Sequence, residues 1–184
     1  MKLLVNRFAE ALKWIDQTGI PFKNFHPGVG PYGEPQLLKK SLGYLIKKYP
    51  NEFKDAKTKR NPDIYIPGNW AIEFKIVRPF GDNGKEAEHW SQNLLHPYPG
   101  NVSSIGDIYK LLNLAYSERK GIIVFTFEND PPNIDLDLIV ECFEHISINV
   151  LSLPIKSKHI AVCENLIHPI HKRSRVFGWE LFGT

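Results

Sequence analysis

Cysteine is scarce in this sequence, which holds only Cys142 and Cys163 and no CxxC pair. A disulfide framework or a thiolate zinc site needs more cysteines at closer spacing, so both thiols are predicted to be free and buried. Long apolar runs are missing too, and none approaches the ~18 residues that a membrane-spanning helix needs. The first residues, interrupted by Asn6, Arg7 and Glu10, do not resemble a signal peptide. We therefore expect a cytoplasmic protein with no membrane partner.

Charge of one sign is not in large excess either. Lys and Arg number 23 against 20 Asp and Glu, which gives a net charge of +3. Such a mild excess permits a polyanionic partner without requiring one, so the location of the charges matters more than their sum. With 184 residues, 42% of them hydrophobic, the chain is expected to form a single α/β domain over residues 1–184.

Hydrophobic spacing predicts the order of helices and strands. Helices are expected over 2–18, from Glu34 to just before Pro50, over 104–117 and over 135–146. Strands are expected over 62–66, 71–77, 121–127, 148–153, 158–163 and 175–182, with 148–153 parallel to 121–127. Ser104 and Asp107 have the spacing of a capping box at the start of the third long helix.

The strand predicted over 71–77, with the sequence AIEFKIV, separates two kinds of side chain. Successive residues of a strand point to opposite faces, so Glu73 and Lys75 lie side by side on one face. Phe74 and its isoleucine neighbours point the other way, toward the core. An acid and a lysine therefore share a face that lacks bulky apolar residues.

The turn before this strand sets what lies opposite Glu73. A three-residue loop over 67–69 pairs Ile66 with Trp70 and puts Asp63 directly across from Glu73, with their β-carbons ~4.5–5.5 Å apart. A two-residue loop would place Asp63 on the opposite face. We expect the longer loop, because it keeps the isoleucines of both strands on the core side.

Two carboxylates at this distance repel each other unless a positive charge lies between them. Mg²⁺ is the expected ion, with Mn²⁺ as a substitute, because it prefers oxygen ligands and keeps several waters. Lys75 would orient or help to deprotonate an attacking water and would stabilise charge that builds on a phosphate.

The residues Asn-Pro-Asp at 61–63, followed after nine residues by Glu73-Phe74-Lys75, resemble the motif of the PD-(D/E)xK nuclease superfamily, also called restriction-endonuclease-like. The resemblance covers roughly residues 34–127, where helix, strands, helix and strand follow in the family's αβββαβ order. It implies a central mixed sheet flanked by helices. Residues 78–103 would then be an insertion and the rest of the chain a C-terminal α/β extension.

The same resemblance implies roles for individual residues. Asp63, Glu73 and Lys75 would be catalytic, and Asp63, Glu73 and the carbonyl of Phe74 would bind the metal ion. Many members add an acid from the preceding helix, for which Glu34 is the candidate. Asp107 is either a helix-capping residue or a secondary group of the site, and the sequence does not decide between them.

Basic and aromatic residues gather near this motif and at the C-terminal end. Residues 54–60 lead directly into Asp63 and are expected to hold phosphates. Residues 78–103 interleave basic residues with Trp90 and Tyr98, which suits a nucleic-acid-contacting segment that is mobile without substrate, although a homodimer contact or a rigid element with a small helix over 86–94 fits too. The predicted nucleic-acid-binding residues are Lys57, Lys59, Arg60, Arg78, Lys85, His89, His96, Lys110, Lys172 and Arg173.

Two further patterns carry less chemistry. Gly28-x-Gly30-x-x-Gly33 matches a dinucleotide-binding string, but no strand precedes it and Pro31 interrupts it, so a plain loop is expected. His89, His96, His168 and His171 lack zinc-site spacing and are expected at the surface or in contact with nucleic acid.

These features together predict a Mg²⁺-dependent DNA endonuclease of a restriction or repair type that hydrolyses phosphodiester bonds with an activated water. RNA as a substrate stays open, as do the cutting mode and the sequence preference. The alternative is a non-catalytic nucleic-acid-binding or interaction module on a similar scaffold. The complete set of two acids and a lysine favours the enzyme.

Overall fold

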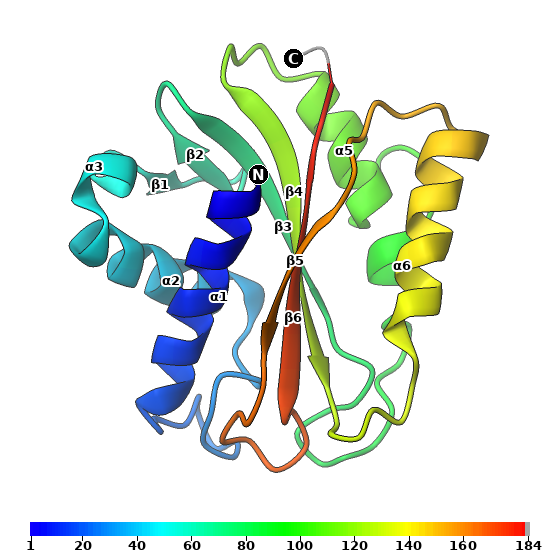
Figure 1. Ribbon diagram of the computed structural model, residues 1–184. Coiled ribbons are helices and arrows are strands. Elements are labelled where there is room, and N and C mark those ends of the chain that lie inside the picture. The colour runs from blue at the N-terminus through cyan, green and yellow to red at the C-terminus, as the bar shows by residue number, and fades with distance from the viewer. Residues whose placement is uncertain (183–184) are drawn as a thin grey trace.

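A six-stranded sheet lies between two layers of helices in the computed structural model, which describes residues 1–182 (Figure 1). The helices are α1 (Lys2–Gln17), α2 (Glu34–Lys48), α3 (Pro50–Phe53), α4 (Gln92–Leu95), α5 (Ser104–Leu112) and α6 (Leu136–His145), and a π-helical turn, η1 (Ile146–Val150), follows α6. The strands are β1 (Lys57–Thr58), β2 (Ile64–Ile66), β3 (Trp70–Val77), β4 (Arg119–Glu128), β5 (His159–Cys163) and β6 (Arg173–Glu180). The expected α/β class with a mixed sheet is confirmed.

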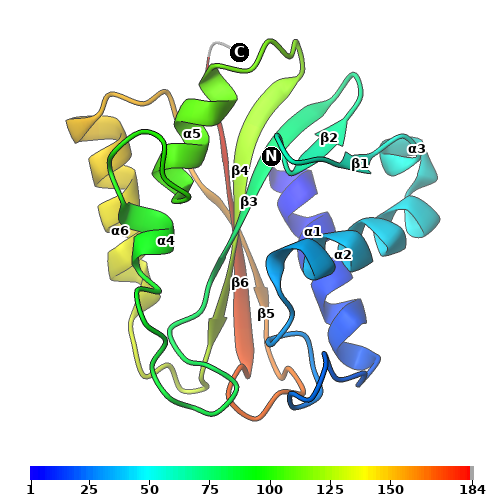
Figure 2. The ribbon, with the colours of Figure 1, turned by 180° about the vertical axis from the view of Figure 1, so that it is seen from behind.

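The strands lie in the order β1-β2-β3-β4-β6-β5. The central pair β3 and β4 is parallel, and every other neighbouring pair is antiparallel. The chain between β3 and β4 crosses over through α4 and α5, as a parallel pair requires. Helices α1, α2 and α3 cover one face of the sheet, and α4, α5 and α6 cover the other (Figure 2).

Alternation along β3 divides its side chains between two cores. Ile72, Phe74 and Ile76 pack with α1 and α2 in one cluster. Ala71 and Val77 pack with α5 and α6 in the other. Both faces of β3 and β4 are covered, which explains why β4 reads as a continuous apolar run. Glu73 and Lys75 therefore lie in the layer between the sheet and α5, where a charged side chain needs a partner.

Several predicted elements differ from those of the structure. Residues 148–153 do not form a parallel strand, because the chain continues from α6 into η1. It next contacts the sheet at the Ile155–Leu181 bridge, beside which the Lys156 amide donates to the Glu180 carbonyl at 2.8 Å. The helix expected over 104–117 ends at Leu112. Its cap is Ser103, whose side chain accepts from the Gly106 amide at 3.1 Å, so Ser104 does not cap it. Both differences arise from contacts to neighbouring elements that periodicity does not encode.

The segment 78–103 contains more structure than a mobile loop would have. The Gly81 amide donates to the Lys85 carbonyl at 2.8 Å, and the Ala87 amide donates to the Pro79 carbonyl at 2.7 Å. Farther along, α4 buries Leu94 against the α5–α6 layer. The short helix lies slightly later than the 86–94 position that the sequence suggested.

The glycine-rich loop packs closely against the C-terminal loop. A β-carbon on Gly30 would lie 2.1 Å from Nδ1 of His171, so only glycine fits there. Gly28 has a φ of +111° and faces the His168 backbone. The glycines thus serve a close packing contact between two loops, and the expected plain loop is confirmed.

Within residues 1–182, none of the helices has the length and apolar character needed to span a membrane. Of the two cysteines, both free, Cys163 is buried beneath α1, but Cys142 is exposed on α6, so the prediction of burial is wrong for Cys142. The sequence placed Cys142 correctly in a helix but could not say which side of it faces solvent.

Candidate active site

The hairpin between β2 and β3 has the predicted register. Ile66 pairs with Trp70 and Ile64 pairs with Ile72, across the loop at residues 67–69. The next position along each strand brings Asp63 opposite Glu73. This follows from pairing alone, because each step outward along one strand advances its partner by one residue in the opposite direction.

Strand β3 extends well beyond the end of β2, and acids occupy the edge left unpaired. The Phe74 amide donates a hydrogen bond of 2.9 Å to Oδ2 of Asp63. Two residues on, the backbone N–H of Ile76 points toward the carboxyl group of Glu34, the first residue of α2. Asp63 and Glu34 therefore take the place of a neighbouring strand, and both carboxyl groups are positioned by main-chain N–H groups.

Glu73 is the most deeply buried acid of the cluster, with 4% of its surface exposed. Its carboxyl group contacts that of Asp63. Burial, together with the nearby carboxyl groups of Asp63 and Asp107, raises the pKa of Glu73 well above its usual range. Oε1 of Glu73 has no hydrogen-bond partner among the described residues. A buried carboxyl oxygen without a hydrogen-bond donor is costly, and Oδ2 of Asp107 is a second such oxygen in the site, although it lies within ion-pair distance of Lys75.

Lys75 is held on the same face by Asp107 of α5. Its Nζ lies 3.1 Å from Oδ2 of Asp107, and Lys110 Nζ lies 2.5 Å from the other carboxyl oxygen. Burial alone would lower the pKa of Lys75, but the negative charges of Asp107 and Glu34 outweigh it, so the pKa is raised. Asp107 therefore pairs with Lys75 and is not the helix cap, which is Ser103.

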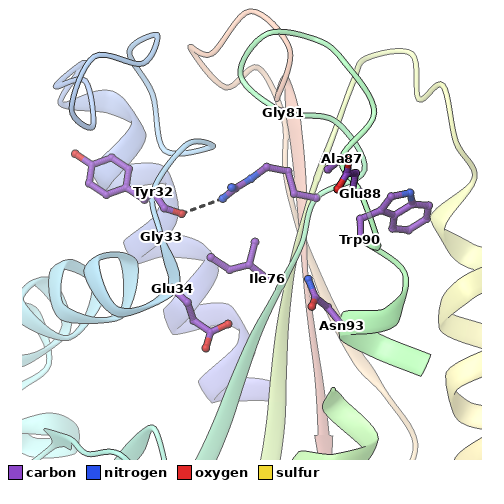
Figure 3. A pocket seen from close by; sticks show the side chains of 10 residues that line it. Tyr32, Gly33, Glu34, Ile76, Gly81, Ala87, Glu88, Trp90 and Asn93 are labelled. Carbon is purple, nitrogen blue, oxygen red and sulfur yellow. Dashed lines mark hydrogen bonds between the residues drawn. The ribbon is translucent and has the colours of Figure 1, made fainter. Parts of the chain in front are cut away.

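Glu34 completes the cluster from the opposite layer of helices. Burial raises its pKa to about 7, an effect that Lys75 opposes and that the Asp63 and Asp107 carboxyl groups reinforce. Its position at the first residue of α2 directs the side chain toward the end of β3 (Figure 3). The early placement in the helix, which made its role uncertain from the sequence, is what lets it reach the strand edge.

The carboxyl groups of Glu34, Asp63 and Glu73 face the same edge of β3, where Oε1 of Glu73 lacks a donor and the pKa values of Glu34 and Glu73 are raised. Their ligand atoms do not all lie within 4.8 Å of one another, since within residues 1–182 only His26, Asp82 and His168 have that spacing. A cation would therefore have to draw the three carboxyl groups closer together. A cation among them would satisfy the unpartnered oxygen and return the acids to their ionised forms. The set contains no thiol or imidazole, which makes Mg²⁺ or Mn²⁺ a better match than zinc.

Two cavities open on either side of Glu34. One has a volume of about 340 Å³ and is lined by Tyr32, Gly33, Glu34, Ile76, Arg78, Gly81, Ala87, Glu88, Trp90 and Asn93 (Figure 3). The other has a volume of about 470 Å³ and is lined by Glu34, Pro35, Leu38, Lys39, Thr58, Lys59, Arg60 and Asp63. Glu34 thus borders both cavities, and Asp63 borders the second. The first is called the Trp90 cavity below, and the second the basic cavity.

The predicted nucleic-acid-binding residues fall into three groups. Lys59 and Arg60 line the basic cavity, and Lys57 is exposed beside them on β1. Arg78 lines the Trp90 cavity and Lys110 contacts Asp107, so both lie near the acids, whereas Lys85, His89 and His96 are exposed farther along the crossover. Lys172 and Arg173 lie at the start of β6, in the C-terminal part of the sheet.

The basic run at residues 171–175 is largely structural. Arg175 is 6% exposed, and its Nε donates to Oε1 of Glu128 at 2.7 Å. It also pairs with Asp137 at the start of α6. This buried network joins β4, β6 and α6, so Arg175 is not available to contact a phosphate.

His168 and His171 are buried, so the expectation of a surface position is wrong for both. Nδ1 of His168 accepts hydrogen bonds from the Ile170 and His171 amides, both at 3.1 Å. The proton of the neutral ring is therefore on Nε2, which donates to Oδ1 of Asp82 at 2.8 Å. Nδ1 of His26 lies 3.1 Å from Oδ2 of Asp82, within hydrogen-bond distance.

These contacts also decide whether His26, Asp82 and His168, whose ligand atoms lie within 4.8 Å of one another, form a metal site. A metal ligand must offer a lone pair, but Nε2 of His168 carries its proton and Nδ1 is occupied by two amides. The cluster is thus a hydrogen-bonded connection among three loops. It fixes the start of the crossover, which leaves β3 just after Lys75.

Some lining residues had no recognisable signal in the sequence. Lys39 lies one helical turn after Pro35, but nothing in α2 indicates which turn faces a cavity. Glu88 and Asn93 lie in a weakly periodic stretch, where only the three-dimensional path of the chain selects them. Comparison with known proteins does not add to these assignments, since no family model, curated protein or solved structure matches this chain.

Proposed function

We propose that the protein is a divalent-metal-dependent nuclease that hydrolyses phosphodiester bonds in DNA. The observation that carries the proposal is the cluster of Glu34, Asp63 and Glu73 with Lys75 at the unpaired edge of β3. A buried set of acids with an unsatisfied oxygen stabilises no fold, because it costs desolvation and repulsion. Such a cost is expected where a cation and a phosphate complete the site.

The order of elements supports the same proposal. Helix α2, the meander of β1, β2 and β3, helix α5 and strand β4 follow one another as the resemblance to the PD-(D/E)xK superfamily implies. In this chain the hairpin supplies two acids and the lysine, and the two flanking helices supply Glu34 and Asp107. The motif and its surroundings are thus mutually consistent.

The roles of the acids follow from their positions. Asp63 and Glu73, with Glu34 and the Phe74 carbonyl, would hold the cation at the end of the hairpin. When bound, Mg²⁺ supplies charge neutralisation for the phosphate and lowers the pKa of a water molecule. Asp63 is positioned for this role by the Phe74 amide, which donates to its Oδ2.

Lys75 would act on the phosphate and the attacking water through its ammonium group. Because Asp107 and Glu34 raise its pKa, Lys75 is protonated at neutral pH and donates hydrogen bonds. Its role is therefore to orient and to stabilise negative charge, rather than to remove a proton. Asp107 positions the side chain from α5, with Lys110 offsetting part of its charge.

The basic cavity would hold the substrate backbone. Lys39, Lys59 and Arg60 lie beside Asp63, so phosphates bound there would lead directly to the acids. Lys59 is supported by the Tyr116 hydroxyl at 3.0 Å and by the ring of Tyr65, whose centroid lies 4.1 Å from Nζ. These contacts hold its ammonium beside Tyr65 and Tyr116, which do not line the basic cavity, so Lys59 would have to release them to reach a phosphate there.

The decisive experiment incubates the purified protein with single- and double-stranded DNA and RNA, in Mg²⁺, in Mn²⁺ and in chelator. We expect cleavage of DNA with either metal and none in chelator. Glu73→Gln should abolish cleavage, whereas Glu141→Gln, on the exposed side of α6, should not. Binding of nucleic acid without cleavage under every condition would contradict the proposal and favour a non-catalytic binding module.

A further inference from the structure

The two cavities beside Glu34 differ in charge. The basic cavity brings three cationic side chains against two carboxyl groups. In the Trp90 cavity, Arg78 alone is cationic, and Glu34 and Glu88 are acidic. A phosphate is attracted to the first and meets carboxyl groups in the second. The Trp90 cavity therefore favours an uncharged part of a ligand.

The walls of the Trp90 cavity offer a stacking surface held in place. Trp90 packs partly against the α5–α6 core, and its Nε1 donates to Oε1 of Glu86 at 3.2 Å. One edge of the ring is thereby fixed, while the residue lines the cavity (Figure 3). An aromatic face of this kind stacks on any nucleobase.

Polar groups beside Trp90 and at the end of β3 suit the edge of a base. The Asn93 side chain makes no hydrogen bond within residues 1–182 and extends into the space between α4 and Glu34 (Figure 3). Its side-chain amide offers a hydrogen-bond donor and an acceptor side by side, which can pair with the acceptor and donor on the edge of a nucleobase. Arg78 is held by the Tyr32 carbonyl at 2.9 Å, and its buried Nε has no partner among the described residues.

The size of the cavity limits what can enter. A volume of about 340 Å³ lies at the small end of the range for small-molecule sites, which suits one base with its sugar rather than a base pair. The space adjoins Glu34, so a base in it would belong to a nucleotide next to the phosphate at the acids. A base that remains paired in a duplex could not reach it.

From this arrangement we propose that the Trp90 cavity is a binding site for a single unpaired nucleobase, stacked on Trp90, next to the phosphate held at Glu34, Asp63 and Glu73. The proposal rests on the proposed nuclease function and narrows its substrate. The strand at the site is single-stranded, or has one nucleotide extruded from a duplex. Phosphates on the other side of the cut lie in the basic cavity.

Fluorescence of 2-aminopurine tests the subsite separately from cleavage. Single-stranded oligonucleotides, each with one 2-aminopurine at a successive position, are bound to the Glu73→Gln protein so that no strand is cut. We expect strong quenching at one position of the bound strand, where the base stacks on Trp90. Trp90→Ala in the same background should abolish this quenching and weaken binding about tenfold, within the range for loss of one stacked base.

Three controls make the outcome specific. Trp90→Phe should retain most of the quenching, because it keeps an aromatic face, and Asn93→Ala should weaken binding without removing the stacking. Trp14→Ala removes an exposed tryptophan from α1, outside the cavity, and should change neither quantity. Circular dichroism melting of each variant shows that it remains folded.

Cleavage by the wild-type protein in Mg²⁺ is measured in parallel. Unchanged quenching and affinity in the folded Trp90→Ala variant would overturn the subsite, even if cleavage is observed. Trp90-dependent quenching with no cleavage under any condition would support the subsite and contradict the nuclease function. Equal quenching of 2-aminopurine in a fully paired duplex, without extrusion, would also overturn the proposal.

Discussion

Glu73 illustrates how a single residue can oppose the stability of the protein that contains it. Its carboxyl group is buried beside Asp63, with one oxygen that no donor among the described residues satisfies. The Phe74 amide donates to Asp63, and Lys110 donates to Oδ1 of Asp107. A neutral side chain of the same shape would fit the fold better, and the proposed role of Glu73 in metal binding accounts for the acid at this position.

Glu73→Gln should therefore stabilise the metal-free protein at pH 7, by roughly 1–3 kcal/mol. The raised pKa means that the folded state favours the neutral acid, so its contribution to stability is present below the ordinary pKa of 4.5 and is lost as pH rises toward the raised value. Urea unfolding at pH 4 and pH 7 measures this. The difference between variant and wild type should appear at pH 7 and shrink at pH 4.

Metal provides the matching control for that prediction. Mg²⁺ should raise the unfolding midpoint of the wild type and have little effect on Asp63→Ala or Glu73→Gln, because each variant removes a ligand. Both variants should also lose cleavage while remaining folded. An unfolded Glu73→Gln protein, or one that Mg²⁺ stabilises as strongly as the wild type, would contradict the assignment.

Lys75→Ala should slow cleavage by a factor on the order of 10² or more while metal binding is largely retained, since the ammonium contacts water and phosphate rather than the ion. Calorimetric titration with Mn²⁺ and a cleavage assay on the same preparation separate the two effects. Lys110→Ala is the comparison, because it removes the other lysine of Asp107 but leaves Lys75 in place. A parallel loss of metal affinity and rate in Lys75→Ala would show that its role is electrostatic support of the ion.

At the scale of elements, the site exists because β2 is short and β3 is long. Strand β2 has three residues and β3 has eight. Some backbone N–H groups of β3 therefore have no strand partner on the β2 side. Asp63 accepts a hydrogen bond from the Phe74 amide, and the carboxyl group of Glu34 faces the Ile76 amide. The same edge opens toward β1 and α2, which carry the basic cavity.

This arrangement predicts the salt dependence of nucleic-acid binding. Neutralising Lys39, Lys59 and Arg60 together should reduce the slope of log affinity against log salt by about one for each phosphate that the protein no longer binds. Neutralising Lys2, Lys13 and Lys47, which are exposed but line neither cavity, is the matched control. Equal slopes for the two triple variants would place the binding surface elsewhere, toward Lys172 and Arg173.

At the scale of the whole molecule, Glu180 at the end of β6 connects three segments that are distant in sequence. Its carboxyl group binds Arg119 of β4, Lys156 before β5 and, at 4.0 Å, the N-terminal amine. The Arg119 guanidinium lowers the pKa of Glu180 to about 2, with burial opposing and Lys156 assisting. Segments distant in sequence are thus connected at the end of β6.

Glu180→Gln should destabilise the protein by about 1–2 kcal/mol at pH 7, after allowance for solvent screening of the exposed Arg119. Because the folded pKa is depressed, the wild type should lose this contribution as pH falls from about 4.5 toward 2, and the variant should show a flatter profile there. Thermal unfolding between pH 2 and pH 7 measures the difference. Glu141→Gln should follow the wild-type profile, and a variant profile as steep as the wild type would exclude this role for Glu180.

The crossover 78–103 should show two kinds of backbone protection in hydrogen exchange. The amides of Gly81 and Ala87 should exchange slowly, because they donate to the Lys85 and Pro79 carbonyls at 2.8 and 2.7 Å. Residues 96–102, with Tyr98 and Val102 largely exposed, should exchange quickly. Addition of DNA to Glu73→Gln should protect residues 88–93. Strong protection throughout without DNA, and no gain with it, would contradict a substrate contact.

Local patterns in the sequence were enough to predict the hairpin and its register. Alternation along β3 and the length of the 67–69 loop fix which residues face each other, because the two-residue period of a strand allows one register that keeps its apolar residues buried. Asp63, Glu73 and Lys75 could therefore be predicted as neighbours. The α/β class and most element positions followed from local spacing in the same way.

Features that depend on two distant segments meeting became visible only in the folded chain. Asp107 could have been a cap until α5 packed on β3 and brought it to Lys75, and Glu34 could reach the strand only because β2 ends early. His168 and Arg175 are buried because the C-terminal part of the chain packs against distant segments. His168 contacts Asp82, and Arg175 contacts Glu128 of β4. Residues 148–153 turned from a predicted strand into a π-helical turn for the same reason. Local spacing encodes the face of an element, whereas the partner of that face depends on how the whole chain packs.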